Sequence, residues 1–191
     1  MARRDLTKDK IVREALSLLD SEGLDGLSMR KLASRLKVQA PTLYYHIPDK
    51  SALLNEVLIT LFQEVFARIP ECDSWQEWMR EFGKAIWDVQ HEARYSPLLI
   101  LTTHMDEQHF ARSVELAANE LRRFDADQEQ LFFVQSAVQA VITGWSVFAN
   151  STYSEKMGRF VDFRDAALNS VDTLVAGWSD KLATRKPVKT A

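Results

Sequence analysis

The sequence of 191 residues has little of what several kinds of protein are built from. Its single cysteine, Cys72, excludes an internal disulfide framework and a cysteine-based zinc finger, and suits a reducing cytoplasm. Six glycines and five prolines are too few for the many tight turns of an all-β protein. No basic segment followed by an apolar run opens the chain, and its purely apolar stretches are far shorter than a membrane span. We therefore expect a cytoplasmic protein with no membrane partner.

The motifs of the common enzyme classes are also missing. The sequence has no phosphate-binding P-loop, no dinucleotide-binding fingerprint, no nucleophile elbow and no His-Glu-x-x-His zinc motif. A metal site at His104, Asp106 and His109 is the less favoured alternative, because histidines five residues apart do not share a helix face. We predict that the protein is not an enzyme and uses no cofactor and no metal.

Charge is distributed unevenly along the chain. Residues 1–50 hold ten Lys and Arg against seven Asp and Glu, a balance of +3, whereas residues 51–191 hold fourteen against twenty, a balance of −6. The excess of positive charge in residues 1–50, called the head from here on, indicates a polyanionic partner for this segment. Chance is the alternative explanation, because the excess is small.

Apolar residues recur at helical spacing almost throughout, so we predict an all-α fold. Thr7 and Ser28 are expected to cap the first two helices, the first is expected to end at Gly23, and Pro41 and Pro48 bracket a short third helix. Further helices are expected over residues 49–68, 74–93, 106–124, 127–151 and 159–182, with a loop at 153–158 and a basic tail from 185. We divide the chain into a helix-turn-helix domain at 1–48, a connecting helix at 49–68 and a ligand-binding and dimerisation domain at 69–191.

The short third helix has an unusual outward face. At about 100° per residue, Leu43 and Ile47 face the core while Pro41 and Tyr45 face away from it. Thr42, Tyr44 and His46 complete a surface without the Lys and Glu of an ordinary solvated helix. Aromatic edges and methyl groups fit thymine methyls in a major groove, and hydroxyls reach phosphates. A partly buried helix with incidental tyrosines is the alternative.

The start of this helix suits an anion. Ala40, expected at the N-cap, has no side-chain acceptor, so the N–H groups of Thr42 and Leu43 are expected to be free for a phosphate. Arg30 and Lys50 each stand at the start of a helix, where a cation is unfavourable unless an anion binds there.

The order of these residues carries a resemblance. Ser28-Met-Arg-Lys-Leu-Ala33, Ala40-Pro-Thr-Leu-Tyr-Tyr-His46 and a lysine before an Ala-Leu-Leu helix start resemble the DNA-binding domain of the TetR family of repressors, near its tetracycline-repressor branch. The likeness is specific over residues 1–60 and beyond them rests on the number and length of the helices. It implies a ligand-responsive repressor that is released from a palindromic operator. The helix face and the resemblance together predict DNA contacts at Arg30, Gln39, Ala40, Pro41, Thr42, Tyr44, Tyr45, His46 and Lys50. Lys37 departs from the pattern because a glycine is usual there, so we expect either a turn without a positive φ or a strained one.

The last two long helices suit a dimer. The helix at 127–151 is apolar almost all round, and a helix with two apolar faces needs two packing partners. Two helices from each of two chains form a four-helix interface, as the resemblance also implies. The predicted homodimer contacts are Val134, Val141, Trp145, Phe148, Val171, Leu174 and Trp178. Burial of these helices inside a monomer is the alternative.

An aromatic stripe at helical spacing runs along residues 74–93. Such stripes are typical of a core, but the resemblance implies an effector pocket here. The predicted lining is Phe62, Phe66, Trp75, Trp78, Phe82, Ile86, Ile100 and Phe110. By the resemblance, tetracycline repressors hold a magnesium–drug chelate with histidines, and Phe66 and Ile100 stand at those positions. We therefore expect a small apolar or aromatic effector bound without metal. The alternative function is an all-helical ligand-binding or interaction protein without sequence-specific DNA binding.

Overall fold

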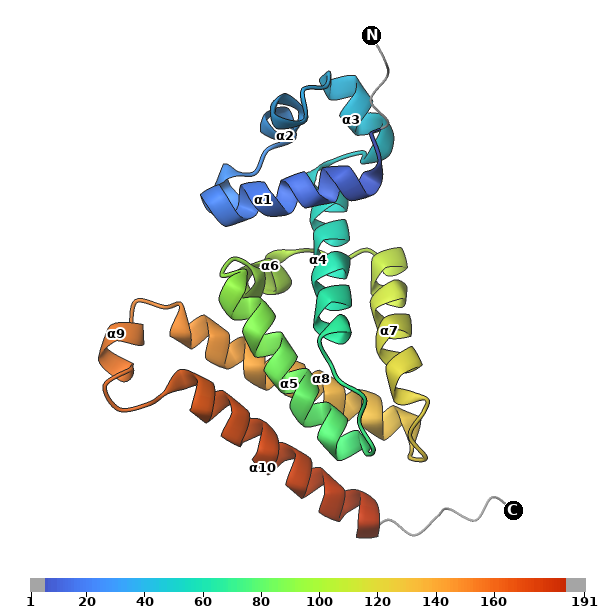
Figure 1. Cartoon of the computed structure of the whole chain (residues 1–191), viewed down its shortest axis with the longest axis vertical. Helices are drawn as coiled ribbons and strands as arrows, with labels where there is room; N and C mark the ends of the chain where they lie inside the picture. The colour runs from blue at the N-terminus through green and yellow to red at the C-terminus, as the bar shows by residue number, and fades with distance from the viewer. Residues whose placement is uncertain (1–5, 185–191) are drawn as a thin grey trace. The chain divides into compact units, whose positions relative to one another are not determined.

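The computed structural model describes residues 6–184, and these residues form helices without any strand (Figure 1). The all-α prediction is thereby confirmed. In chain order the helices are α1 (Lys8–Gly26), α2 (Met29–Leu36), α3 (Ala40–His46), α4 (Lys50–Ala67), α5 (Trp75–Glu92), α6 (Ser96–Thr102), α7 (Glu107–Leu121), α8 (Gln128–Ala149), α9 (Ser154–Met157) and α10 (Phe163–Thr184).

The first helices begin where their capping residues place them. The Lys10 N–H donates to Thr7 Oγ1 over 3.3 Å, and the Lys31 N–H donates to Ser28 Oγ over 3.3 Å. Each bond satisfies one of the backbone donors that a helix N-terminus leaves free, which contributes about 1 kcal/mol. The two predicted caps are confirmed.

Several predicted boundaries were wrong. The first helix does break at Gly23 as predicted, because the φ of 69° there lies in the left-handed region that glycine tolerates, but a further helical segment extends α1 to Gly26. The predicted loop at 153–158 contains the short helix α9, and α10 begins at Phe163 rather than at Arg159. Helix α6 was not predicted, because its sequence reads as a short apolar run after Pro97. The predicted basic tail from residue 185 lies outside the described residues.

Within the described residues the chain forms two compact units. One comprises residues 6–63 with 93–113, and the other comprises residues 64–92 with 114–184. The chain passes between the units after Gln63, Glu92 and Ser113, and the first and last of these crossings lie inside the helices α4 and α7. The helix-turn-helix region thus shares its unit with a segment from much later in the sequence.

In the second unit α5, α8 and α10 pack against one another. Gly83 of α5 permits the close approach, because a Cβ there would lie 3.2 Å from Val171 Cγ2 and 3.5 Å from Val138 Cγ1. Within the described residues α8 alone has the length and apolar composition of a membrane-spanning helix. Four of its apolar residues are fully buried in this unit, as in a core helix: Leu131, Val134, Val138 and Ile142.

Candidate functional site

The turn between α2 and α3 is closed by a left-handed residue. Lys37 has a φ of 56° and a ψ of 41°, and its N–H donates to Ser34 O over 3.1 Å. The Val38 N–H donates to Ala33 O over 3.0 Å, which satisfies a carbonyl at the end of α2. A residue with a Cβ in this conformation costs about 1–2 kcal/mol, because its Cβ approaches the following carbonyl oxygen. The turn is therefore the strained one of the two forms expected for Lys37.

Helix α3 presents the outward face that its sequence predicts. Leu43 and Ile47 are buried, whereas 87% of the Tyr45 side chain and 46% of Tyr44 are exposed. His46 is half-buried and meets the Tyr45 ring edge-on, with the ring centroids 5.4 Å apart. Among the other predicted DNA contacts of this helix, Ala40 is half-buried, and the exposed residues are Gln39, Pro41 and Thr42.

The predicted anion site at the start of α3 was wrong. The N-cap is Gln39 rather than Ala40, and no side chain caps the helix. The N–H groups of Thr42 and Leu43 both donate to Gln39 O, over 3.0 Å and 3.4 Å, and neither is free for a phosphate. The helix starts one residue earlier than expected, so Pro41 falls inside its first turn and these two donors already have a carbonyl within reach.

Five cations lie between Ser28 and Lys50, and three of them have partners in the head itself. Lys31 pairs with Glu22, Arg35 Nε pairs with Glu14 Oε1 over 2.6 Å, and Lys50 Nζ donates to Leu24 O over 3.4 Å. Arg30 and Lys37 are exposed and have no hydrogen bond or ion pair from their side chains within residues 6–184. Their charges are therefore available to a partner outside the chain.

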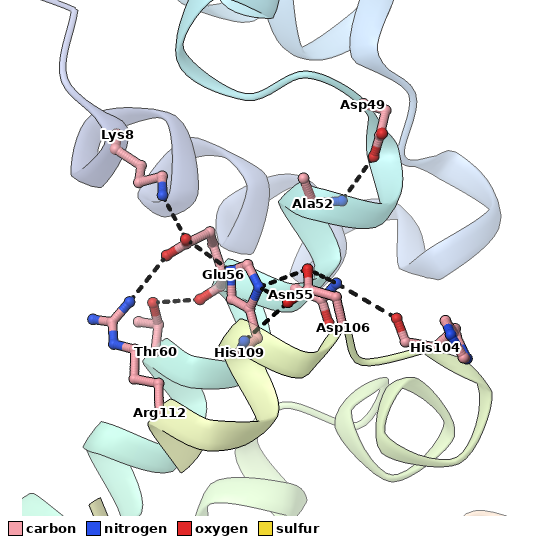
Figure 2. A network of polar contacts seen from close by, with 10 residues as sticks. All are labelled: Lys8, Asp49, Ala52, Asn55, Glu56, Thr60, His104, Asp106, His109 and Arg112. Carbon is pink, nitrogen blue, oxygen red and sulfur yellow. Dashed lines mark hydrogen bonds and ion pairs between the residues drawn. The ribbon is translucent and has the colours of Figure 1, made fainter. Parts of the chain in front are cut away.

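The first unit also contains a polar network centred on the Glu56 carboxylate of α4 (Figure 2). Glu56 Oε1 lies 2.5 Å from Lys8 Nζ of α1 and 2.9 Å from His109 Nε2 of α7. Arg112 Nη1 lies 3.4 Å from Glu56 Oε2. The other ring nitrogen of His109 lies 2.8 Å from Asp106 Oδ1. The network thus joins α1 and α4 to the start of α7.

A second polar side chain of α4 reaches the segment before α7. Asn55 Nδ2 lies 3.5 Å from the His104 carbonyl oxygen and 3.4 Å from Asp106 Oδ2 (Figure 2). Asn55 is almost fully buried, and these contacts satisfy only the donor end of its amide. Asn55 of α4 therefore holds the loop between α6 and α7 at two points, the backbone carbonyl of His104 and the carboxylate of Asp106.

The network shifts the pKa values of its members in opposite directions. Burial lowers the pKa of His109, but hydrogen bonds to Asp106 and Glu56 outweigh it, so the pKa lies above its ordinary value. Burial raises the pKa of Glu56, but hydrogen bonds from Lys8 and His109 outweigh it and hold the pKa low. The backbone N–H and the ring of His109 lower the pKa of Asp106. Because each ring nitrogen of His109 faces a carboxylate, the geometry favours the imidazolium, which donates to both.

The predicted effector residues fall in both units. Phe62, Ile100 and Phe110 belong to the first unit, and Phe110 is mostly exposed there. In the second unit the rings of Phe66, Trp78 and Phe82 form a near-parallel stack, with the Trp78 and Phe82 centroids 5.0 Å apart. Ile86 is buried with them and Trp75 is half-buried. The Trp78 side chain is fully buried, and its Nε1 has no hydrogen-bond partner within residues 6–184.

The outer surface of α8 and α10 differs from the predicted interface. Val134 and Val171 are buried inside the single chain, because these sides of α8 and α10 face the core shared with α5. Of the other predicted contacts, Phe148 is exposed and the rest are half-buried: Val141, Trp145, Leu174 and Trp178. Other apolar or small residues of these two helices are also exposed: Phe133, Ala140, Gly144, Val147 and Gly177.

Comparison with known proteins gives the fold its family. The family model described as bacterial regulatory proteins, tetR family, matches residues 11–57. The class E tetracycline repressor of Escherichia coli is 44% identical over 93 residues, which cover 45% of this chain and 43% of the repressor. The solved TetR of Acinetobacter baumannii AYE is 26% identical with a TM-score of 0.71, over 93% of this chain and 99% of that one. Residues 11–57, the helix-turn-helix region, therefore belong to the TetR family.

Two other relatives are similar to this chain, one in sequence and one in fold. The class D tetracycline repressor of Escherichia coli is 34% identical over 116 residues, which cover 58% of this chain and 50% of the repressor. The Streptomyces coelicolor protein ActR, solved in complex with actinorhodin, has a TM-score of 0.77 at 23% identity, over 95% of this chain and 99% of ActR. The chain thus covers half or less of the length of these curated repressors.

The residues of this chain at the expected positions do not fit a magnesium chelate. Phe66 and Ile100 offer no metal ligand at the positions where the resemblance implies histidines. Within residues 6–184 no group of three or more His, Cys, Asp and Glu side chains is arranged to hold a metal ion. Both ring nitrogens of His109, a member of the alternative metal site, are engaged by carboxylates.

The Glu56 network predicts a pH-dependent stability. The folded pKa of His109 lies above its unfolded value of about 6.5, so its stabilisation is fully present below that pH and is lost as pH rises through the folded pKa. A folded pKa that lies one pH unit above the unfolded pKa corresponds to about 1.4 kcal/mol of stability. We expect His109→Gln to lower the free energy of unfolding in urea at about pH 5.5, and to lower it less at about pH 8.5.

His104→Gln is the matched control, because the His104 side chain is exposed and only its carbonyl takes part in the network. It should leave the free energy of unfolding close to that of the wild type at both pH values. A cost of His109→Gln that stays constant across this range would contradict the charged state of the ring.

Proposed function

We propose that the protein is a transcriptional regulator, a repressor that binds a palindromic operator through α2 and α3 and leaves it when a small molecule binds the second unit. The observation that carries the proposal is the exposed face of α3 with Tyr44 and Tyr45, together with Arg30 of α2, an exposed cation without a partner in the described residues. Two exposed tyrosines on a seven-residue helix contribute little to the core, and they have the chemistry of a groove-binding surface. Membership of residues 11–57 in the TetR family supports the same conclusion.

The contacts divide into two kinds by chemistry. Arg30 carries an unpaired guanidinium, which matches the O6 and N7 acceptors of guanine. Gln39, Pro41 and Tyr45 are exposed at the N-terminus and on the outward face of α3, so we assign them to base edges with Arg30. The remaining members of the predicted set flank this face, and we assign them to phosphates or to support of the tyrosines: Ala40, Thr42, Tyr44, His46 and Lys50.

Substitutions of Arg30 and Lys50 should separate these two kinds of contact. Arg30→Ala should relax sequence preference at one base position, at a cost of about 1–3 kcal/mol in specific binding. Lys50→Ala should weaken binding to all DNA alike and reduce the slope of log affinity against log salt by about one per protomer. The measurement is a titration of labelled duplexes at several salt concentrations, with a palindrome recovered by selection and a random sequence. Equal losses on both duplexes for both variants would refute the division.

The same selection tests the function as a whole. Wild-type protein should retain fragments that share a palindrome, with binding that weakens steeply as salt rises. Retention without a shared sequence would instead favour the all-helical interaction protein that lacks specific DNA binding.

A palindromic operator needs two copies of the head, so we propose a homodimer through the second unit. The outer surface of α8 exposes 59% of Phe133 and 50% of Phe148. The Phe133 ring lies against Trp178 of α10, with centroids 5.3 Å apart, so the two helices form one apolar surface. A Cβ on Gly144 or Gly177 would meet nothing within 4 Å, which leaves room for the helices of a second copy to approach closely.

We expect Phe148→Glu to split this dimer without unfolding the chain, because half of the side chain is already exposed. Sedimentation should give a dimer mass for the wild type and a monomer mass for the variant. Leu98→Glu is the matched control, since 54% of Leu98 is exposed in the other unit, and it should remain dimeric. A monomer mass for the wild type at every concentration would contradict the proposed dimer.

For the effector we propose a planar, mostly apolar molecule with a hydrogen-bond acceptor, bound without metal. The stack of Phe66, Trp78 and Phe82 supplies aromatic faces for such a molecule. The buried Trp78 Nε1 is a donor without a partner within residues 6–184, and a buried unpaired donor costs about 1–3 kcal/mol until an acceptor reaches it. Effector binding releases DNA only to the extent that the effector prefers the released state, and a shift from 99:1 to 1:99 needs about 5.5 kcal/mol.

Trp78→Phe should weaken the response to the effector and leave effector-free DNA binding intact, because it keeps an aromatic ring and removes the N–H. The measurement is release of labelled operator by a panel of planar aromatic ketones, with and without a chelator. Trp87→Phe, a buried tryptophan on a neighbouring face of α5, is the matched control. Release that disappears when the chelator is added would contradict the metal-free site.

A further inference from the structure

Lys37 is the one non-glycine residue with a positive φ among residues 6–184. It closes α2 in a left-handed conformation, where glycine is the residue that avoids the contact between Cβ and the backbone. The fold needs a left-handed residue here but not a lysine, so a strained lysine points to a role for its side chain outside the fold.

The Lys37 ammonium takes no part in holding the head together. The side chain is exposed and has no ion pair or hydrogen bond within the described residues. Its neighbours on α2 behave differently, since Lys31 pairs with Glu22 and Arg35 pairs with Glu14. The backbone N–H of Lys37 thus caps α2, but its charge makes no contact with the rest of the described chain.

The position of Lys37 places its charge beside the recognition helix. It lies two residues before Gln39, the N-cap of α3, and consecutive Cα atoms are about 3.8 Å apart. A lysine side chain adds a long flexible stem that carries a point charge. When α3 lies in a major groove, a cation this close to its N-terminus has the phosphates bordering that groove within reach.

We propose that Lys37 binds a DNA phosphate at the edge of the groove that α3 enters, and that the strained turn is retained for this charge. The proposal rests on the proposed function as a DNA-binding regulator. Because the contact is with the backbone of the DNA, it adds affinity and register on any sequence and does not select bases.

Three substitutions at Lys37 separate strain from charge. Lys37→Gly removes both, Lys37→Asn removes the charge and keeps a residue that tolerates the left-handed region, and Lys37→Arg keeps the charge. We expect Lys37→Gly to raise the midpoint of thermal unfolding by about 2–4 °C. We expect both uncharged variants to bind DNA about five- to tenfold more weakly at about 0.1 M salt, with the salt slope reduced by about 0.9 per protomer.

The probes are a random-sequence duplex and the palindrome selected by the wild-type protein, and the losses should be equal on both. Lys37→Arg should retain the wild-type salt slope. Lys156→Asn is the control for net charge, because Lys156 is an exposed lysine of α9 in the other unit, and it should bind as the wild type does.

An unchanged affinity and salt slope in Lys37→Gly would overturn the proposal, as would a loss confined to the palindrome. Failure of Lys37→Arg to keep the slope would also overturn it. If the wild-type protein binds neither duplex, the proposed function fails. If the wild-type protein binds normally and the Lys37 variants bind as well as it does, only the role of Lys37 fails.

Discussion

The first unit depends on a carboxylate that the fold buries. Glu56 of α4 is 7% exposed, and a buried carboxylate costs several kcal/mol unless cations and hydrogen-bond donors surround it. Those cations come from both ends of the unit, with Lys8 on α1 and with His109 and Arg112 on α7. Removing one partner leaves a charge that the others satisfy only in part. The start of α7 therefore belongs to the same compact unit as the helix-turn-helix.

This attachment bears on the proposed response to an effector, because two helices continue from the first unit into the second. Helix α7 holds Glu56 through its first turns and continues past Ser113 into residues of the second unit. Helix α4 likewise carries Glu56 and ends with Phe66, a member of the aromatic stack, and Ala67. Helix α4 is continuous between Lys50, proposed to contact DNA, and Phe66, proposed to contact the effector. A change at one end of either helix has a covalent route to the other unit.

Local chemistry was enough to predict much of the head. Caps at Thr7 and Ser28 depend on neighbours three residues away, and the faces of α3 follow from the helical step alone. The start of α3 was placed one residue late, because Ala40 and Gln39 are both plausible N-caps when no side chain caps the helix. Because the helix starts one residue earlier, the N–H groups of Thr42 and Leu43 have the Gln39 carbonyl as a partner.

Features that depend on distant residues were not predictable. The partners of Glu56 lie 48 and 53 residues away, and no local pattern marks them. On α8 the sequence shows two apolar stripes and does not say which one packs inside the chain. The stripe with Val134 is buried against the core, and the stripe with Gly144 faces outward. Gly83 of α5 permits this packing, because it has no Cβ to keep α8 and α10 away. Aspartate and histidine at 106 and 109 have a spacing that metal sites also use, yet here they form an ion pair.

The small buried part of α3 affects which substitutions this helix tolerates. Of the seven residues of α3, only Leu43 is buried, and Ile47 secures the end of the helix from the position that follows it. The exposed positions can change without opening a cavity or stranding a buried polar group, so their substitutions have small effects on folding. Under the proposed function, the DNA sequence that α3 reads can therefore change while the free energy of unfolding stays nearly constant.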